Sequence, residues 1–310
     1  MVDNGQRPTV WDWRQSALIC ASLMIIGFGL QWAVGSVVWT VLAWPVNIIT
    51  LVALLLGLLI MHALRNKVHL FRYLSTLPAA IPSIATTLIL TMAMGLIRQD
   101  TNGHWLHHML TSWAFVLAYA YMTVIIGLTT LRRLSKIATS LRKPKRTFSL
   151  SDLAFIFNHA GLFVALTCGT LGNPDIQSLK MIANIGAIEW RGADDNGMLH
   201  NLPIAIELQR FIMETYDDGS PRRFASDIHV LTKHGKELQA TVDVNHPLEI
   251  DGWKIYQYGY DTQAGVQSRI SIFEFVRDPW LPYVYVGILM MLAGALFMLF
   301  GSGRKEVKAS

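Results

Sequence analysis

The sequence has little charge and almost no cysteine, and both shortages limit what the protein can be. Charged residues make up 15% of its 310 residues, whereas hydrophobic residues make up 52%. A soluble domain usually carries about 25% charged residues, so this composition is that of a membrane protein. The two cysteines, Cys20 and Cys168, form no Cys-x-x-Cys pair. Dithiol exchange with a substrate is therefore excluded as the chemistry of this chain.

Long uncharged runs predict six membrane-spanning helices. No charged side chain occurs in the fifty residues from Gln15 to Leu64, and such a run holds two spans of about 20 residues each. We expect a transmembrane region over residues 1–171, with helices at about 16–36, 46–64, 78–97, 110–131 and 153–171. A polar domain is expected over 172–279, and a sixth helix with a short tail over 280–310.

Basic residues predict the orientation of these helices. Fifteen of the 26 lysines and arginines lie in the two tails or in the loops after the second and fourth predicted helices. These parts are expected in the cytoplasm, so the domain at 172–279 is expected outside it. The basic run at 132–146 is interpreted as a topology signal and not as a nucleic-acid site, so no nucleic-acid partner is expected.

The polar domain has the alternation of half-buried strands. Ile204, Ile206 and Leu208 alternate with Ala205 and Glu207, and residues 238–244 repeat the pattern. Several short strands separated by turns predict an antiparallel β-rich domain, either a β-sandwich or a related open barrel. The domain contains no recognisable catalytic triad or carboxylate pair, so no catalytic residue is assigned.

One histidine lies deep in a predicted span. His159 is near the middle of the fifth helix, and an ionisable side chain inside a bilayer is a candidate for function because its placement there is costly. A neutral imidazole can ligate haem iron, and Gly161 beside it leaves room for a flat macrocycle. The alternative is a structural hydrogen bond between helices, for example through Asn158.

Other histidines lie near helix ends. His104, His107 and His108 precede the fourth predicted helix at spacings of three and four residues, so a helical start places them on one face. There they either bind haem or a metal or cap the helix. At 1.5 Å per residue, His62 lies roughly 3 Å from the cytoplasmic end of the second predicted helix, whereas His159 lies roughly 12 Å from the cytoplasmic end of the fifth. This mismatch in depth weakens a bis-histidine pair between them.

Four ordered motifs resemble the ResB family of cytochrome c biogenesis proteins, the CcsB-like half of system II. The motifs are Leu202–Leu208 with Phe211 and Tyr216, then Val244–Leu248, Gly252–Gln257 and Asp278–Trp280, within roughly residues 150–300. The resemblance implies a complex that carries haem outward and joins it to a Cys-x-x-Cys-His apocytochrome c. It also implies that His159 is an axial ligand of a transient b-type haem, and that no metal other than haem iron is bound.

The chain departs from the common layout of that family. It has five predicted helices before the outer domain instead of three, and the tryptophan-rich WWD haem motif of the CcsA-type partner is absent. The resemblance therefore implies a non-catalytic or co-catalytic subunit of a haem lyase in a bacterial inner membrane. Its expected partners are a CcsA- or ResC-type protein and apocytochrome c, with thiol-reducing membrane proteins as neighbours. A b-type cytochrome or quinone-linked electron-transfer subunit, and a cofactor-free anchor or receptor, remain the alternatives.

Overall fold

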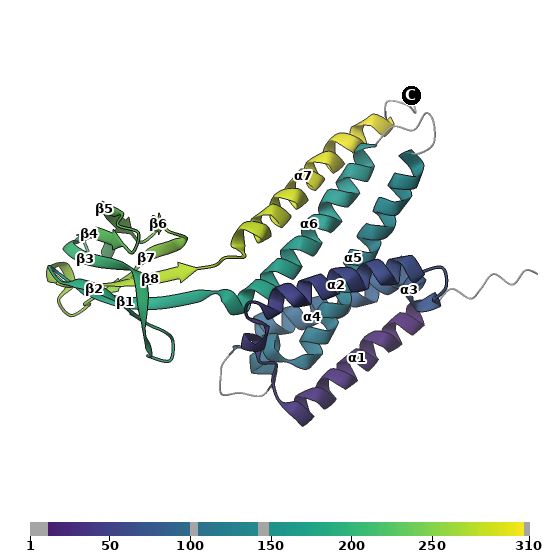
Figure 1. The fold of residues 1–310 in the computed structure, drawn as a ribbon, viewed down its shortest axis with the longest axis horizontal. Helices are drawn as coiled ribbons and strands as arrows, with labels where there is room; N and C mark the ends of the chain where they lie inside the picture. Colours follow the sequence, from purple (N-terminus) through teal and green to yellow (C-terminus); the bar gives the residue numbers. More distant parts are fainter. Residues whose placement is uncertain (1–11, 100–104, 142–148, 307–310) are drawn as a thin grey trace, which may run out of the picture. The chain divides into compact units, whose positions relative to one another are not determined.

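The computed structural model describes residues 12–99, 105–141 and 149–306. Clustering of contacts divides the chain into two compact units. The helical unit contains the chain up to Pro174 and again from Trp280 onward, and the β unit contains Asp175–Pro279 (Figure 1).

Six helices among the described residues are long and apolar enough to cross a membrane. They are α1 (Trp13–Val34), α2 (Val46–Leu64), α4 (Leu77–Leu96), α5 (Trp113–Leu141), α6 (Leu150–Gly172) and α7 (Leu281–Glu306). The shorter helical segments are η1 (Trp39–Leu42), α3 (His69–Tyr73), η2 (Trp105–Thr111), η3 (Asn173–Asp175) and η4 (Gly265–Gln267). The prediction of a multi-pass membrane protein with six spans is confirmed.

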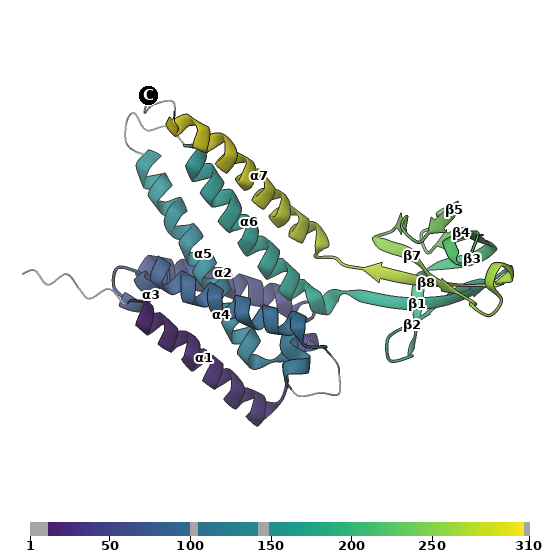
Figure 2. The same cartoon turned by 180° about the vertical axis from the view of Figure 1, so that it is seen from behind.

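The helices α6 and α7 run side by side as a pair (Figures 1 and 2). Glycines make their contact close: a Cβ placed on Gly161 would lie 2.6 Å from the carbonyl oxygen of Gly287, and one on Gly287 would lie 2.6 Å from that of Gly161. Small residues allow membrane helices to approach in this way. The interpretation that Gly161 leaves room for a macrocycle is therefore wrong, because α7 fills that space.

A proline inside α4 ties this helix to α1. Pro82 has no N–H, so the carbonyl of Pro78 loses its usual intrahelical donor. The hydroxyl of Ser16 on α1 donates to that carbonyl and also contacts the hydroxyl of Tyr73. A neighbouring helix thus satisfies a main-chain group that the apolar interior of a bilayer leaves without water.

The β unit is one antiparallel sheet of eight strands in the order β5-β4-β3-β2-β1-β8-β7-β6. The strands are β1 (Gln177–Asn184), β2 (Ile188–Ala193), β3 (Leu199–Thr215), β4 (Pro221–Thr232), β5 (Glu237–Asp243), β6 (Leu248–Ile250), β7 (Trp253–Tyr260) and β8 (Ile270–Arg277). The strands β5 and β6 lie at opposite ends of this order, yet only residues 244–247 join them. The sheet therefore has to curl until its two edges approach each other.

The result is a nearly closed barrel with a single core. Its inner face is lined by fully buried side chains, among them Met181, Ile206, Ile228, Ile255 and Phe273. The predicted antiparallel β domain is confirmed, and its form is that of the open barrel and not of two packed sheets. The alternation of Ile204, Ile206 and Leu208 arises because each of these side chains points into the core.

Candidate functional site

His159 lies on the face of α6 that packs against α5. On this face, a Cβ placed on Gly127 of α5 would lie 3.0 Å from the Phe163 ring. Nearer the start of α6, Asp152 binds Arg133 of α5 with an oxygen–nitrogen distance of 2.5 Å. His159 is one helical turn from Phe163 and two from Asp152, so it lies between these two contacts.

The imidazole of His159 is held in one orientation. Its Nδ1 lies 2.9 Å from the carbonyl oxygen of Phe155, so Nδ1–H donates to that carbonyl. The Phe155 ring stacks on the imidazole, with centroids 3.9 Å apart and planes 14° apart. A proton on Nδ1 leaves the lone pair on Nε2, and among the described residues none makes a hydrogen bond to that nitrogen. Histidines that bind metals are commonly fixed by such a bond to their other ring nitrogen.

A charged pair supports the aromatic stack. The Arg133 guanidinium carbon lies 5.3 Å from the centre of the Phe155 ring while its Nη2 binds Asp152. Asp152, Phe155 and His159 thus form one stripe of α6 that faces α5, at spacings of three and four residues. Asp152 and Phe155 are not among the predicted site residues, although their spacing from His159 is a signal that the sequence contains.

His62 and His159 lie at more similar depths along their helices than the distances from the predicted helix ends indicate. Asn47 of α2 donates to the carbonyl of Leu171 on α6 at 3.2 Å, which aligns the two helices at that end. Counted from this contact at 1.5 Å per residue, His62 lies roughly 22 Å along α2 and His159 roughly 18 Å along α6. The Nε2 of His62 is engaged, because it lies 2.7 Å from the hydroxyl oxygen of Ser135 on α5.

The second predicted histidine cluster is only partly described. His104 lies outside the described residues, and η2 contains His107 and His108. The helical face predicted for the cluster is interrupted at His108, whose backbone angles of φ −133° and ψ 45° are not helical. The Nδ1 of His107 lies 2.7 Å from the carbonyl oxygen of Arg98, so His107 has the same type of main-chain partner as His159. Within the described ranges, no three histidine, cysteine or acidic side chains converge on a metal position.

The four sequence motifs prove to be architectural. Residues 244–248 join the two edges of the barrel, and Gly252 has a φ of +80° in the turn before β7, a conformation that glycine adopts most readily. Trp253 is buried against Phe275, with ring centroids 6.3 Å apart. A Cβ placed on Gly172 would lie 2.3 Å from the Cβ of Trp280. Trp280 therefore packs the start of α7 closely against the end of α6.

The fold and the site together define a class of protein. It is a multi-pass membrane protein that inserts a nearly closed β barrel before its last span and orients one histidine in the span before that barrel. Residues 148–275, which contain α6 and nearly all of the β unit, match the ResB-like family. This stretch of the chain is therefore assigned as ResB-like.

Named relatives agree with this assignment. The cytochrome c biogenesis protein Ccs1 of Porphyra purpurea is 31% identical over 134 residues, which are 42% of this chain and 30% of that protein. The chloroplastic cytochrome c biogenesis protein CCS1 of Oryza sativa subsp. japonica is 33% identical over 164 residues, 50% of this chain and 27% of that protein. This chain thus spans less than a third of the length of either relative.

A solved structure also aligns with the chain. It is the Cytochrome c Heme Lyase CcmF, which aligns with 72% of this chain and 38% of its own length, at 12% identity and a TM-score of 0.36.

Proposed function

We propose that this chain is a ResB-like subunit of a haem delivery and attachment complex for cytochrome c maturation, acting with a CcsA-type partner. The observation that carries the proposal is the match of residues 148–275 to the ResB-like family, because this stretch contains both His159 and nearly all of the β unit. Haem is the cargo in this proposal and not a resident cofactor. The β unit lies outside the cytoplasm, as the distribution of basic residues predicts.

His159 meets the chemical requirement for holding that cargo. Haem iron takes a neutral imidazole nitrogen as an axial ligand. The Nδ1 of His159 is bonded to the carbonyl of Phe155, which leaves Nε2 without a hydrogen-bond partner among the residues that the structure describes. The orientation is fixed before haem arrives, which lowers the entropic cost of binding. His107 has the same type of partner and remains a candidate for an external haem site, with His104 and His108 beside it in the sequence.

Reconstitution tests the proposal. We expect the chain, expressed with a CcsA-type protein and a Cys-x-x-Cys-His acceptor, to support covalent haem attachment, and to fail without the CcsA-type protein. A partner-only expression is the matched control. Efficient attachment by this chain alone would overturn the division of labour, and no gain over the CcsA-type protein alone would overturn the function.

The b-type cytochrome alternative gains one observation from the structure, the similar depth of His62 and His159. The engaged Nε2 of His62 argues against it, since that nitrogen would have to leave Ser135 before it could reach iron. An absorption spectrum of the purified protein distinguishes the two functions. Stoichiometric haem that cycles between oxidised and reduced forms would support a b-type cytochrome, whereas substoichiometric haem supports transient cargo.

A further inference from the structure

The strand β5 forms an edge of the sheet that is left almost unpaired. It pairs with β4 on one side through seven consecutive residues, from Asp243 opposite Ala225 to Glu237 opposite Leu231. On its other side a single bridge joins Asp243 to His246. The strand β6 has only three residues and pairs with β7, so it does not cover the rest of this edge.

The free main-chain groups of this edge can be identified. Asp243 donates its N–H to the carbonyl of His246 and accepts from the N–H of His246, at 3.4 and 3.2 Å. The main-chain groups of Asp243 therefore point away from β4. In an antiparallel strand the direction alternates, so those of Thr241 and Gln239 point away from β4 as well. Among the described residues they have no main-chain partner, and both residues are exposed.

The middle of this edge lacks the features by which exposed edges are usually protected. Proteins blunt such edges with charges, prolines or bulges. The strand β5 carries a charge at each end, Glu237 and Asp243, but the five residues between them read Leu-Gln-Ala-Thr-Val and contain neither charge nor proline. The register between β4 and β5 has no shift, unlike the pairings of β2 with β3, β3 with β4 and β7 with β8. The edge is thus regular and suited to accept another strand.

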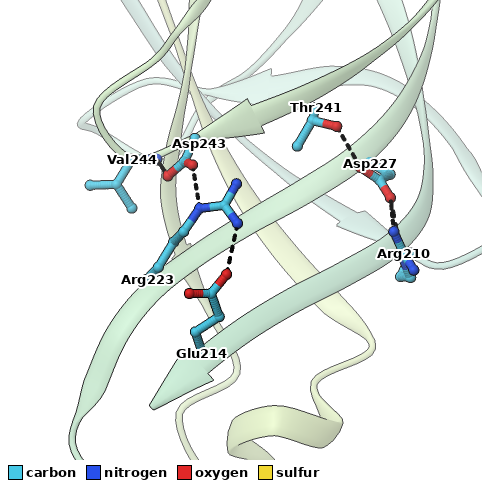
Figure 3. Close-up of polar contacts among 7 residues, drawn as sticks. All are labelled: Arg210, Glu214, Arg223, Asp227, Thr241, Asp243 and Val244. Atoms are coloured by element: carbon cyan, nitrogen blue, oxygen red, sulfur yellow. Dashed lines mark hydrogen bonds and ion pairs between the residues drawn. The ribbon is translucent and has the colours of Figure 1, made fainter. Parts of the chain in front are cut away.

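Side-chain contacts hold β5 in this regular form (Figure 3). The hydroxyl of Thr241 donates to Asp227 of β4 at 2.6 Å, and Arg210 of β3 binds the other oxygen of that carboxylate at 2.7 Å. Arg223 of β4 binds Asp243 at 2.6 Å. These contacts use side chains alone, so they fix the strand while the main-chain groups of Gln239 and Thr241 stay available.

We propose that an extended segment of the apocytochrome acceptor adds to the free edge of β5 as a further strand. This inference rests on the proposed function. In an apocytochrome without haem, an extended segment presents main-chain N–H and C=O groups that can pair with this edge. Recognition through the main chain tolerates different side chains, which suits a factor that receives acceptors of differing sequence. A second copy of this chain fits less well, because antiparallel self-pairing centred on Ala240 would place Glu237 opposite the Asp243 of the other copy, and like charges directly opposite destabilise a pair.

A matched pair of substitutions at Gln239 tests the edge in the full-length protein. Gln239→Pro removes one outward N–H and is compatible with an edge strand, whereas Gln239→Ala removes the side chain and keeps that N–H. The probe is a labelled synthetic peptide of an apocytochrome around its Cys-x-x-Cys-His site, with serines in place of the cysteines, and binding is measured by fluorescence anisotropy. We expect about tenfold weaker binding for Gln239→Pro, as follows from one lost main-chain hydrogen bond, and a change below about twofold for Gln239→Ala.

A second measurement leaves the protein unaltered. Methylation of alternate main-chain nitrogens of the peptide blocks strand pairing in one frame and leaves it intact in the other, so we expect only one of two methylated peptides to bind wild-type protein. Equal binding by both, or by Gln239→Pro and wild type, would overturn strand addition while haem attachment with the CcsA-type protein still supports the proposed function. Crosslinks at Gln239 between copies of this chain would also overturn it. Loss of both peptide binding and haem attachment in the wild-type protein would overturn the function together with this inference.

Discussion

Replacement of His159 separates a haem ligand from a structural histidine. In His159→Ala, the structural loss is one hydrogen bond to the Phe155 carbonyl and one aromatic stack. The hydrogen bond is worth roughly 0.6–2 kcal/mol inside a membrane, and an aromatic pair about 0.5–1.5 kcal/mol. The combined cost of about 1–3.5 kcal/mol lowers stability but leaves the protein able to insert and fold.

A lost axial ligand has a different consequence. If the Nε2 of His159 binds iron, His159→Ala should lower the haem that copurifies with folded protein and abolish cytochrome c maturation. Exogenous imidazole is small enough to enter the vacated position and should restore part of both. A structural histidine predicts no such rescue, because free imidazole cannot replace a stacked side chain that is bonded to its own helix.

Phe155→Leu is the matched control for this experiment. It removes the ring that stacks on His159 at 3.9 Å but keeps the main-chain carbonyl that accepts from Nδ1. We expect a stability loss similar to that of His159→Ala, with haem content per folded protein largely kept. Haem is measured by absorbance of the purified variants, and maturation by covalent haem in a reporter cytochrome. Unchanged haem and normal maturation in His159→Ala would refute the assignment and direct attention to His104, His107 and His108.

Further predictions concern packing, topology and pH. Gly287→Ala should destabilise the pair of α6 and α7 by about 1–3 kcal/mol because the added Cβ meets main-chain atoms. Gly29→Ala, whose added Cβ meets nothing within 4 Å, should cause no such loss. Thermal unfolding in detergent measures both variants. Ser16→Ala should cost about 1–3 kcal/mol by leaving the Pro78 carbonyl unpaired, with the exposed Ser22→Ala as its control. Reporter fusions at Ser140 and Gly219 should report cytoplasm and exterior, and the reverse result would refute the topology. The Thr241 hydroxyl and the Arg210 guanidinium hold the pKa of Asp227 below its usual range. The contribution of Asp227 to the stability of the β unit is therefore present above about pH 4 and is lost as the pH falls further. Asp227→Asn should flatten this pH dependence, as measured by limited proteolysis of the β unit.

The sequence predicts those features of the fold that depend on local composition. A span needs an apolar run and the absence of charge, so the run from Gln15 to Leu64 is sufficient to predict α1 and α2. The end of α5 is different: the helix continues past the predicted end at residue 131 to Leu141, because a helical main chain satisfies its own hydrogen bonds after the apolar run has stopped. The strands of the β unit are likewise readable from alternation, which one buried face imposes on each of them.

Pairings between distant residues are not readable in this way. The free edge of β5 follows from the order of all eight strands, and no short stretch of sequence specifies that order. The role of Gly161 is not readable for a related reason, because the sequence shows a small residue beside His159 but not that Gly287 of α7 occupies the space. The orientation of His159 depends on Phe155 four residues earlier, a local relation that the sequence does contain.

The stretch that matches the family does not build the face of His159 by itself. Residues 148–275 include α6 but not α5, and α5 supplies Arg133 and Gly127 on either side of the histidine along that face. The helix α5 is in turn fixed by other contacts: Tyr119 donates to the carbonyl of Leu166 at 3.1 Å, and a Cβ on Gly27 of α1 would lie 2.5 Å from the Cα of Ala114. The helices outside the matched stretch therefore set the depth and the surroundings of His159. Substitutions in α1 or α5 that shift this packing should alter haem content without touching any histidine.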